Sequence, residues 1–297
     1  IVPNDYYLLY LNHMKFKESN STSQIGVEIT DVDISKPLSK DELNSIYDLW
    51  VKNAVAIFPN QKLTHDEYND FAMQFGSFGD EPFLTPMKSQ IHIVELRRKA
   101  TEEATHFGGS WHSDWSFQPS PPSATMLHSK IVPPLGGDTL FSNSALAYDE
   151  MSNEMKDKIY NLNGIHSAKL PYADNGFYAL ENKKRTMRIK SSKSANKQHL
   201  HPLVREHLNT QRKSLFINPV YTVGVEGMND MEAFEFLSEL FEHMTQDKYI
   251  YRHQWDKDML IMWDNRSVMH MAEGGYDGYE RLMHRITIAG ETPIKSI

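Results

Sequence analysis

The sequence has no cysteine among its 297 residues, so disulfides, iron–sulfur clusters, zinc–thiolate sites and cysteine nucleophiles are excluded. It also lacks an apolar run approaching the roughly 20 residues that a membrane-spanning helix needs. No signal-peptide pattern opens it, although Ile1 in place of an initiator methionine leaves open whether a leader was removed. Basic residues are not in excess, because the formal net charge is -8 at pH 7, and this argues against general nucleic-acid binding. We therefore expect a cytoplasmic protein that binds neither membranes nor nucleic acids.

Apolar residues make up 40% of the chain, which is enough to bury a core in one large domain or two small ones. Without cysteine, a metal site must use histidine and carboxylate ligands, and 14 histidines are present. Residues 1–22 end in a serine-rich polar run, so we expect them to be a mobile lead-in. We expect residues 23–297 to form a single domain.

Two capping boxes predict helices in the first third of the chain. Ser39 is followed by Glu42, and Thr64 by Glu67, each just before a helical pattern. The apolar run at 54–58 between them is typical of a buried strand, and the alternation over 25–32 predicts another.

Short strand-like runs dominate the rest of the chain, separated by glycine and proline clusters. They lie at 91–96, 124–129, 139–141, 214–217, 259–263 and 282–288. Helical patterns return at 144–162 and at 229–246, where Phe234 is expected to belong to the apolar stripe. This arrangement predicts a mainly β protein with peripheral helices around a double-stranded β-helix, the cupin-like jelly roll.

Residues 181–197 break the composition, with seven basic side chains against one acid. A solvated surface loop explains this composition, and we favour it over a mobile lid that attracts anions toward a pocket.

His112 and Asp114 are the candidate metal ligands, because side chains two apart in extended backbone point to the same side. The distant His270 is the candidate for a third ligand. Two histidines and one carboxylate leave three octahedral positions open, which suits an iron(II) oxygenase that takes a bidentate 2-oxo acid and dioxygen. An isolated H-x-D pair is common by chance, so each fragment alone is a weak signal. The competing pair His199 and His201 lacks a convincing carboxylate partner and is interpreted as structural or exposed.

Two arginines follow in a strand-like run. Period two puts Arg281 and Arg285 on one face of residues 281–288. If that face lines a barrel interior, the two buried charges need anions, and two anion sites would satisfy them. The alternative is a wet strand whose arginines pair with local acids such as Glu280.

Taken together, these fragments resemble the taurine dioxygenase (TauD/TfdA) family of iron(II)/2-oxoglutarate-dependent dioxygenases, from about Gly26 to Pro293. The resemblance rests on an opening strand at 25–33, Trp111-His112-Ser113-Asp114, Gly136-Gly137-Asp138-Thr139, the segments 201–205 and 216–219, Trp263-Asp264-Asn265-Arg266 with His270, and the two arginines.

The resemblance implies roles for individual residues. His112, Asp114 and His270 would bind Fe(II). Thr139 and Arg281 would hold the distal carboxylate of 2-oxoglutarate, Thr139 through its hydroxyl.

Further family positions concern the substrate. Arg285 would face its anionic group or assist the cosubstrate, while Trp263 and Phe117 would be pocket walls or ordinary aromatic core. Taurine-cleaving members carry His-Pro where this chain has Glu81-Pro82. A carboxylate repels a sulfonate, so taurine is disfavoured, and Glu81 would pair with Arg285 or with a substrate amine or hydroxyl. Trp115 would narrow the pocket.

The resemblance therefore implies a dioxygenase that uses Fe(II), 2-oxoglutarate and O2 to hydroxylate a small organic acid, such as a sulfonate, sulfate ester, carboxylate or amino acid. By family analogy it would be a homo-oligomer, a dimer or tetramer. Desaturation or cyclisation stays open. Two alternatives are a jelly-roll binding protein with a vestigial metal site and a zinc-dependent hydrolase using the same three ligands.

Overall fold

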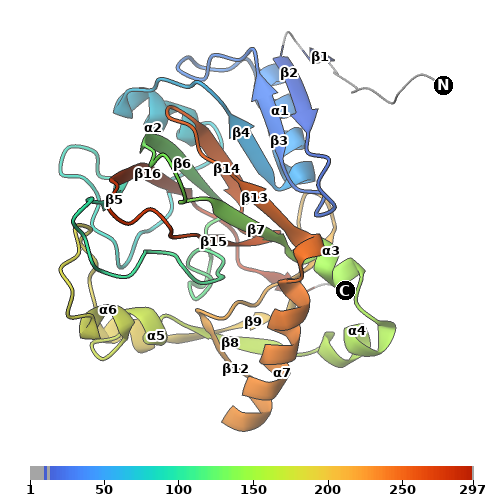
Figure 1. The fold of residues 1–297 in the computed structure, drawn as a ribbon. Coiled ribbons are helices and arrows are strands. Elements are labelled where there is room, and N and C mark those ends of the chain that lie inside the picture. Colours follow the sequence, from blue (N-terminus) through green and yellow to red (C-terminus); the bar gives the residue numbers. More distant parts are fainter. Residues whose placement is uncertain (1–9, 12–13, 296–297) are drawn as a thin grey trace.

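The computed structural model describes residues 10–11 and 14–295, and its largest element is an eight-stranded sheet (Figure 1). The strand order is β1-β2-β3-β4-β14-β6-β16-β5, and within this sheet only β3 and β4 pair in parallel. The strands are β1 (Tyr10–Leu11), β2 (Met14–Glu18), β3 (Val27–Thr30), β4 (Val55–Phe58), β5 (Val94–Arg98), β6 (Ala124–Ile131), β14 (Leu260–Asp264) and β16 (Arg281–Ile288). Segments from both ends of the chain therefore meet in one sheet.

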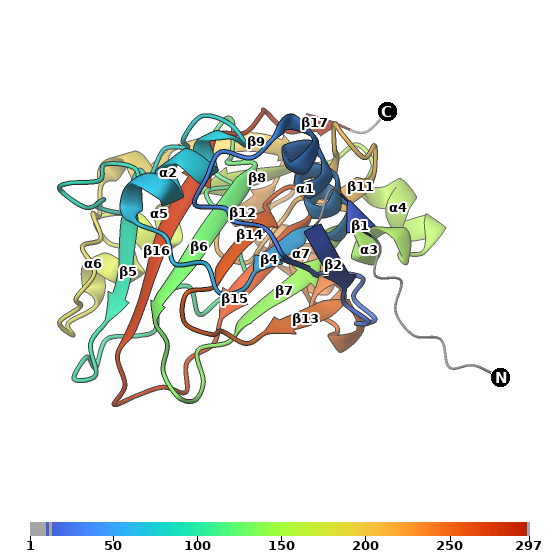
Figure 2. The same cartoon turned by 90° about the horizontal axis from the view of Figure 1, so that it is seen from above.

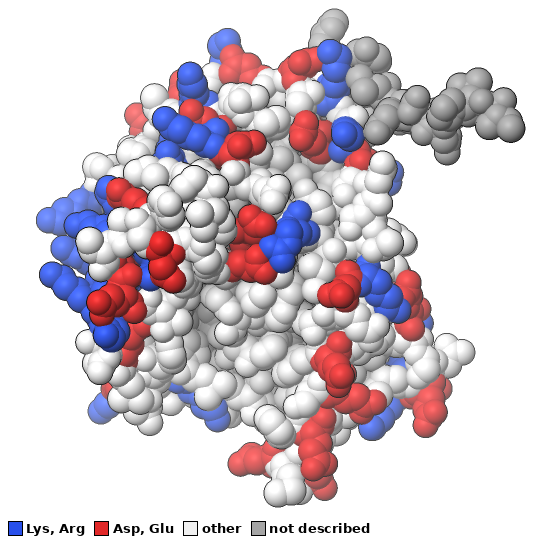
Figure 3. Space-filling view, in the orientation of Figure 1, with Lys and Arg blue, Asp and Glu red and all other residues white. Residues whose placement is uncertain are grey.

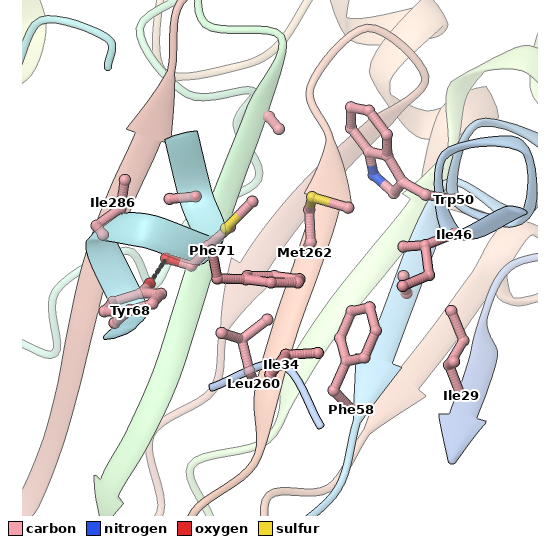
Figure 4. Packing of buried hydrophobic residues seen from close by; sticks show 14 of the residues in the cluster. Ile29, Ile34, Ile46, Trp50, Phe58, Tyr68, Phe71, Leu260, Met262 and Ile286 are labelled. Carbon is pink, nitrogen blue, oxygen red and sulfur yellow. Dashed lines mark hydrogen bonds between the residues drawn. The ribbon is translucent and has the colours of Figure 1, made fainter. Parts of the chain in front are cut away.

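The outer face of this sheet is covered by α1 (Lys40–Asn53) and α2 (His65–Met73), as Figure 2 shows from above. Both predicted capping boxes are present, with Ser39 accepting from the Glu42 amide and Thr64 from the Glu67 amide. The apolar faces of the helices and the sheet form one packed cluster (Figure 4), which includes Ile46, Trp50, Phe58, Phe71 and Met262. Burial of these side chains holds the helices on the sheet.

Three smaller sheets have the orders β13-β7-β15, β12-β8-β9 and β11-β10-β17. Their strands are β7 (Thr139–Asn143), β8 (Asn163–Ser167), β9 (Gln198–Pro202), β10 (Val204–Glu206), β11 (Lys213–Leu215), β12 (Thr222–Val225), β13 (Ile250–His253), β15 (Val268–Ala272) and β17 (Ile294–Lys295).

The sheet β13-β7-β15 packs against the inner face of the large sheet. In β14, Leu260 and Met262 face the helices, whereas Ile261 and Trp263 face the inner core, where they meet Phe141 of β7. Since both faces are covered, β14 is apolar without alternation. Two packed sheets with peripheral helices confirm the predicted jelly-roll class.

The remaining helices lie around the smaller sheets. They are α3 (Ser144–Asp149), α4 (Asn153–Ile159), α5 (Lys169–Tyr172), α6 (Phe177–Leu180), α7 (Asp230–Met244) and the 3-10 turns η1 (Lys193–Asn196) and η2 (Asp247–Tyr249). The helix predicted at 144–162 is divided, because Ser152 caps a new helix by accepting from the Met155 amide. Phe234 of α7 is 72% exposed, so its assignment to the apolar stripe was wrong, and Phe236 is buried instead. The buried face of α7 runs through Phe236, Leu237 and Leu240, one position out of phase with Phe234.

The prediction that residues 1–22 form a mobile lead-in is wrong for β2. Met14–Glu18 pair with Val27–Thr30, and Met14 and Phe16 are buried in the cluster beneath α1. This strand gives a weak signal in the sequence, because only two of its side chains, Met14 and Phe16, point inward and a polar run follows it. Residues 1–9 and 12–13 lie outside the described residues.

Residues 181–197 form a loop with η1 and a single bridge from Ile189 to Leu84. Figure 3 shows lysine and arginine side chains gathered at the edge where this loop runs after α6 in Figure 1. Among the described helices, none has the length and apolar character needed to cross a bilayer.

Candidate metal centre

The inner face of β16 carries both arginines into the interior. Arg281 and Arg285 are 7% and 3% exposed, and Met283 between them belongs to the inner core. Glu280 pairs with Arg97 on β5 instead, so the alternative of a wet strand paired to Glu280 was wrong. The period-two prediction therefore holds, and two guanidinium groups lie inside the barrel.

His112 and His270 are brought together by a β-bridge. The His112 amide donates to the His270 carbonyl at 3.0 Å, and the His270 amide donates back at 2.8 Å. Asp114 lies beside them, with its carboxylate oxygens 3.7 Å from His112 Nε2 and 3.8 Å from His270 Nε2. One ligand atom from each of the three buried residues lies within 4.8 Å of the other two, a spacing at which one metal ion can bind all three.

Hydrogen bonds from neighbouring residues orient these ligands. His112 Nδ1 lies 2.7 Å from the Ser110 carbonyl, which leaves Nε2 facing the centre. The Thr125 hydroxyl donates to Asp114 Oδ2 at 2.7 Å and itself accepts from the Asn265 side-chain amide at 2.9 Å. Asn265 belongs to the Trp-Asp-Asn-Arg motif, so this motif helps to position the carboxylate.

The charges of the three residues suit a divalent cation. Burial lowers the pKa of His270 to about 3 and also lowers the pKa of His112, so both imidazoles are neutral at pH 7. Burial alone would raise the pKa of Asp114, but the Arg285 guanidinium and the two imidazoles hold it below its usual range. Neutral imidazoles and an ionised carboxylate are the protonation states that bind a metal.

The backbone turns sharply after the H-x-D pair. Trp115 has φ 46, a left-handed conformation that is unfavourable for a residue with a bulky side chain. The resemblance implied that Trp115 would narrow the pocket. Trp111 packs against the hydrophobic cluster that contains the buried face of α7, and the Ser113 hydroxyl donates to the Val268 carbonyl. The turn places Trp115 in the wall of a cavity.

Arg281 lies in a cavity next to the three ligands and is not paired with a carboxylate of the described residues. Arg281 Nη2 donates to the Gly137 carbonyl at 3.4 Å, a long hydrogen bond. Its Nε has no hydrogen-bond partner among the described residues. Burial lowers its pKa. Thr139 lines the same cavity and accepts from Trp255 Nε1 at 3.0 Å, so its own hydroxyl proton is available to an anion. The two residues together are suited to hold a carboxylate.

Arg285 is paired within the protein. Its Nε donates to Glu81 Oε1 at 2.9 Å and its Nη1 to Asp114 Oδ1 at 2.8 Å. Glu81 Oε2 accepts from Trp115 Nε1 at 2.9 Å. Burial raises the pKa of Glu81, and Arg285 opposes that shift. Glu81 was expected to pair with Arg285 or with a substrate group, and in the structure it pairs with Arg285.

A second cavity of about 350 Å³ adjoins the first, since His112 and Arg285 line both. Its walls are mostly aromatic, and they include Phe107, Trp115, Tyr172, Phe177, Tyr178 and Tyr221.

The predicted pocket walls are divided between the two cavities and the core. Trp115 lines the aromatic cavity, and Trp263 lines the cavity of Arg281. Phe117 lines neither cavity, because it packs behind Trp115 and Tyr221 in the core. The tyrosines of the aromatic cavity escaped prediction from the sequence because they come from α5, α6 and the turn before β12, without a shared spacing.

The basic loop contributes one wall. Arg185 and Met187 line the cavity of Arg281, and Glu181 holds Arg185 through a bidentate pair with a closest distance of 2.8 Å. His201 is buried, with Nε2 2.9 Å from the Gln118 carbonyl, and among the described residues the competing His199/His201 pair belongs to no group spaced to bind a metal ion.

A model of the family described as taurine catabolism dioxygenase TauD, TfdA family matches residues 17–287. The chain is 34% identical over 260 residues to an alpha-ketoglutarate-dependent 2,4-dichlorophenoxyacetate dioxygenase of Cupriavidus pinatubonensis, covering 82% of this chain and 87% of the relative. It is 29% identical over 301 residues to an alpha-ketoglutarate-dependent sulfonate dioxygenase of Saccharomyces cerevisiae, covering 95% and 69%.

The crystal structure of AAD-2 in complex with Mn(II) and N-oxalylglycine superposes with a TM-score of 0.73 at 26% identity, covering 96% of this chain and 99% of that one. Enzymes of this kind use Fe(II), 2-oxoglutarate and O2, and the residues present fit that set. The three ligands converge on one point, and Arg281 offers an unpaired buried guanidinium next to them. The chain belongs to the TauD/TfdA family and is an alpha-ketoglutarate-dependent dioxygenase.

Proposed function

We propose that this enzyme hydroxylates a C–H bond of a small organic acid. The balanced reaction converts R–H, 2-oxoglutarate and O2 into R–OH, succinate and CO2. Where the hydroxylated carbon bears an oxygen or sulfur substituent, the product collapses to a carbonyl compound and releases that group. The names of the two relatives support this class, since one refers to an aryloxyacetate and the other to sulfonates.

His112, Asp114 and His270 would hold the iron. Bound there, iron(II) supplies the activation of dioxygen on which the hydroxylation depends. The protein keeps the two imidazoles neutral by burial and keeps Asp114 ionised through Arg285, so the ligands need no proton loss on binding.

Arg281 and Thr139 would bind the distal carboxylate of 2-oxoglutarate. A buried guanidinium without an anion is unfavourable, and a carboxylate that accepts from both residues removes that penalty. The contact orients the cosubstrate so that its keto acid end points to the metal ligands, of which His112 and His270 lie in the wall of the same cavity.

The aromatic cavity would take the substrate. Trp115, Tyr172 and Tyr221 pack against one another and surround the side of the metal centre formed by His112. Their apolar faces exclude water and place a C–H bond next to the centre rather than a second polar group.

One observation carries the proposal: an unpaired, buried Arg281 shares a cavity with His112 and His270, two members of a buried His/Asp/His set. The alternatives of a vestigial binding protein and a zinc hydrolase give no reason for that cation. By family analogy we also expect a dimer or tetramer, which light scattering tests.

The experiment is an anaerobic titration of the Fe(II) protein with 2-oxoglutarate, monitored by the metal-to-ligand charge-transfer band. We expect the band to appear with 2-oxoglutarate and to shift when small sulfonates, sulfate esters, aryloxyacids or amino acids bind. Admission of air should then yield succinate. A protein that shows no band and forms no succinate would refute the proposal.

A further inference from the structure

Arg285 faces the aromatic cavity but is compensated on several sides. Glu81 accepts from its Nε and Asp114 from its Nη1, and the Trp115 ring lies 5.3 Å from its central carbon. Only Nη2 has no partner among the described residues. The cavity thus meets an arginine whose charge is already balanced and whose one nitrogen without a partner among the described residues is Nη2.

Glu81 is dedicated to this arrangement. Its side chain is 10% exposed, and both of its oxygens are used, one by Arg285 and one by Trp115. It does not line the aromatic cavity, so a substrate there meets its partners rather than its carboxylate. Two donors, one of them cationic, favour its ionised form and oppose the effect of burial, which raises its pKa.

The formal charges of the loaded site then cancel. Iron(II) balances the 2-oxoglutarate dianion, and Asp114 and Glu81 balance Arg281 and Arg285. No other lysine or arginine lines the aromatic cavity among the described residues. A neutral, apolar site gains nothing from a buried anionic group, which would lose its hydration there.

We propose that Glu81 is a specificity-determining residue that neutralises Arg285, so that the substrate presents an uncharged group to this guanidinium. This inference rests on the proposed function and sharpens it. The reacting end of the substrate would be apolar or aromatic, with an uncharged acceptor such as an ether oxygen or sulfone oxygen for Nη2. Any acid group of the substrate would lie at the solvent end of the cavity, away from Arg285.

The test uses an isosteric pair of probes, benzenesulfonate and methyl phenyl sulfone, which differ mainly in charge. Each is titrated into the anaerobic Fe(II)/2-oxoglutarate protein, with binding followed by the shift of the charge-transfer band and by calorimetry. We expect wild type to bind the sulfone at least roughly tenfold tighter than the sulfonate, equivalent to about 1.4 kcal/mol. Wild type that prefers the sulfonate, or that fails to bind the sulfone at millimolar concentration, would overturn the inference.

Glu81→Gln removes the charge and keeps the shape. It should bind benzenesulfonate roughly tenfold or more tighter than wild type, with little change for the sulfone. Glu81→Asp keeps the charge and should keep the wild-type preference. An unchanged preference in a folded Glu81→Gln protein would also contradict the role of Glu81.

A matched control is Glu291→Gln. Glu291 pairs at 2.6 Å with Arg205, a buried arginine outside both cavities. The Glu291→Gln variant should bind benzenesulfonate and methyl phenyl sulfone with the affinities of wild type. If Glu81→Gln does not fold, as shown by its melting curve, the wild-type comparison of the two probes still decides. Absence of the band with 2-oxoglutarate alone rejects the proposed function, whereas a normal band with the opposite probe preference rejects only the role of Glu81.

Discussion

Two buried arginines of this molecule have opposite environments. Arg266 forms a bidentate pair with Asp264, at 2.8 and 2.9 Å, and His207 donates to the same carboxylate at 2.9 Å. Arg281 is buried to a similar degree, but no carboxylate of the described residues pairs with it. Both lie near strands of the same large sheet, so the contrast comes from their partners rather than their depth.

The difference separates a structural charge from a binding charge. A paired buried ion fixes neighbouring elements, and breaking the pair leaves an uncompensated charge. An unpaired buried ion is unfavourable in the free protein and becomes favourable only when a ligand supplies the opposite charge. The first should affect stability and the second should affect ligand binding.

The largest expected effect is at the metal centre. His112→Ala removes one of three ligands, so turnover of 2-oxoglutarate should fall below detection, because two ligands hold iron(II) poorly. Its melting temperature should stay close to that of wild type. His199→Ala, in the competing histidine pair, is the matched control and should retain activity. Succinate release measures both, and undiminished turnover by His112→Ala would disprove the assignment.

At the paired arginine, Asp264→Asn should lower the free energy of unfolding by about 3–5 kcal/mol, because Arg266 stays buried without its counter-charge. Urea denaturation measures this change. The 2-oxoglutarate requirement of the folded fraction should be unaltered. A stability equal to wild type would mean that the pair contributes nothing.

The same carboxylate should make stability depend on pH. Burial alone would raise the pKa of Asp264, but Arg266 and His207 hold it below its usual range in the folded state. Its contribution is therefore complete above the unfolded pKa, about 4, and is lost as the pH falls toward the folded pKa. The stability difference between wild type and Asp264→Asn should shrink when denaturation is repeated from about pH 6 down to about pH 3. A gap that is constant over that range would contradict the linkage.

At the unpaired arginine, Arg281→Met should raise the 2-oxoglutarate concentration for half-maximal rate by roughly 10- to 150-fold, since a charged hydrogen bond contributes about 1.5–3 kcal/mol. Its stability should be equal to wild type or higher, because an uncompensated buried charge is removed. Arg252→Met, at a half-exposed arginine paired with Glu273, is the control and should leave the requirement unchanged. An unchanged requirement for Arg281→Met would dismiss the cosubstrate role.

The smallest effect is expected at an exposed pair. Asp149 and Arg212 form an ion pair at 2.8 Å, and their side chains are 50% and 40% exposed. Because solvent screens such a pair, Asp149→Asn should change the free energy of unfolding by less than about 1 kcal/mol. Urea denaturation of Asp149→Asn and Asp264→Asn side by side compares an exposed ion pair with a buried one. Equal losses of stability in the two variants would show that burial does not set the size of the effect.

Much of the fold could be predicted from local patterns. Both capping boxes begin helices at the expected residues, and the run 281–288 is a strand with its arginines inside. Errors arose where local signals were short or mixed. The strand Met14–Glu18 has only two inward side chains, and Phe234 lies beside the buried face of its helix. In both places packing against distant residues decides burial.

The sequence by itself determined the ligand types, the strand period that points two arginines inward, and the absence of thiol chemistry. The tertiary structure alone decided that the His112 and His270 backbones pair, that Glu81 and Asp114 share Arg285 while Arg281 stays unpaired, and that scattered aromatics enclose one cavity. The physical reason is range. Periodicity and capping act over a few residues, whereas the balance of buried charges depends on groups that only folding brings within hydrogen-bond distance.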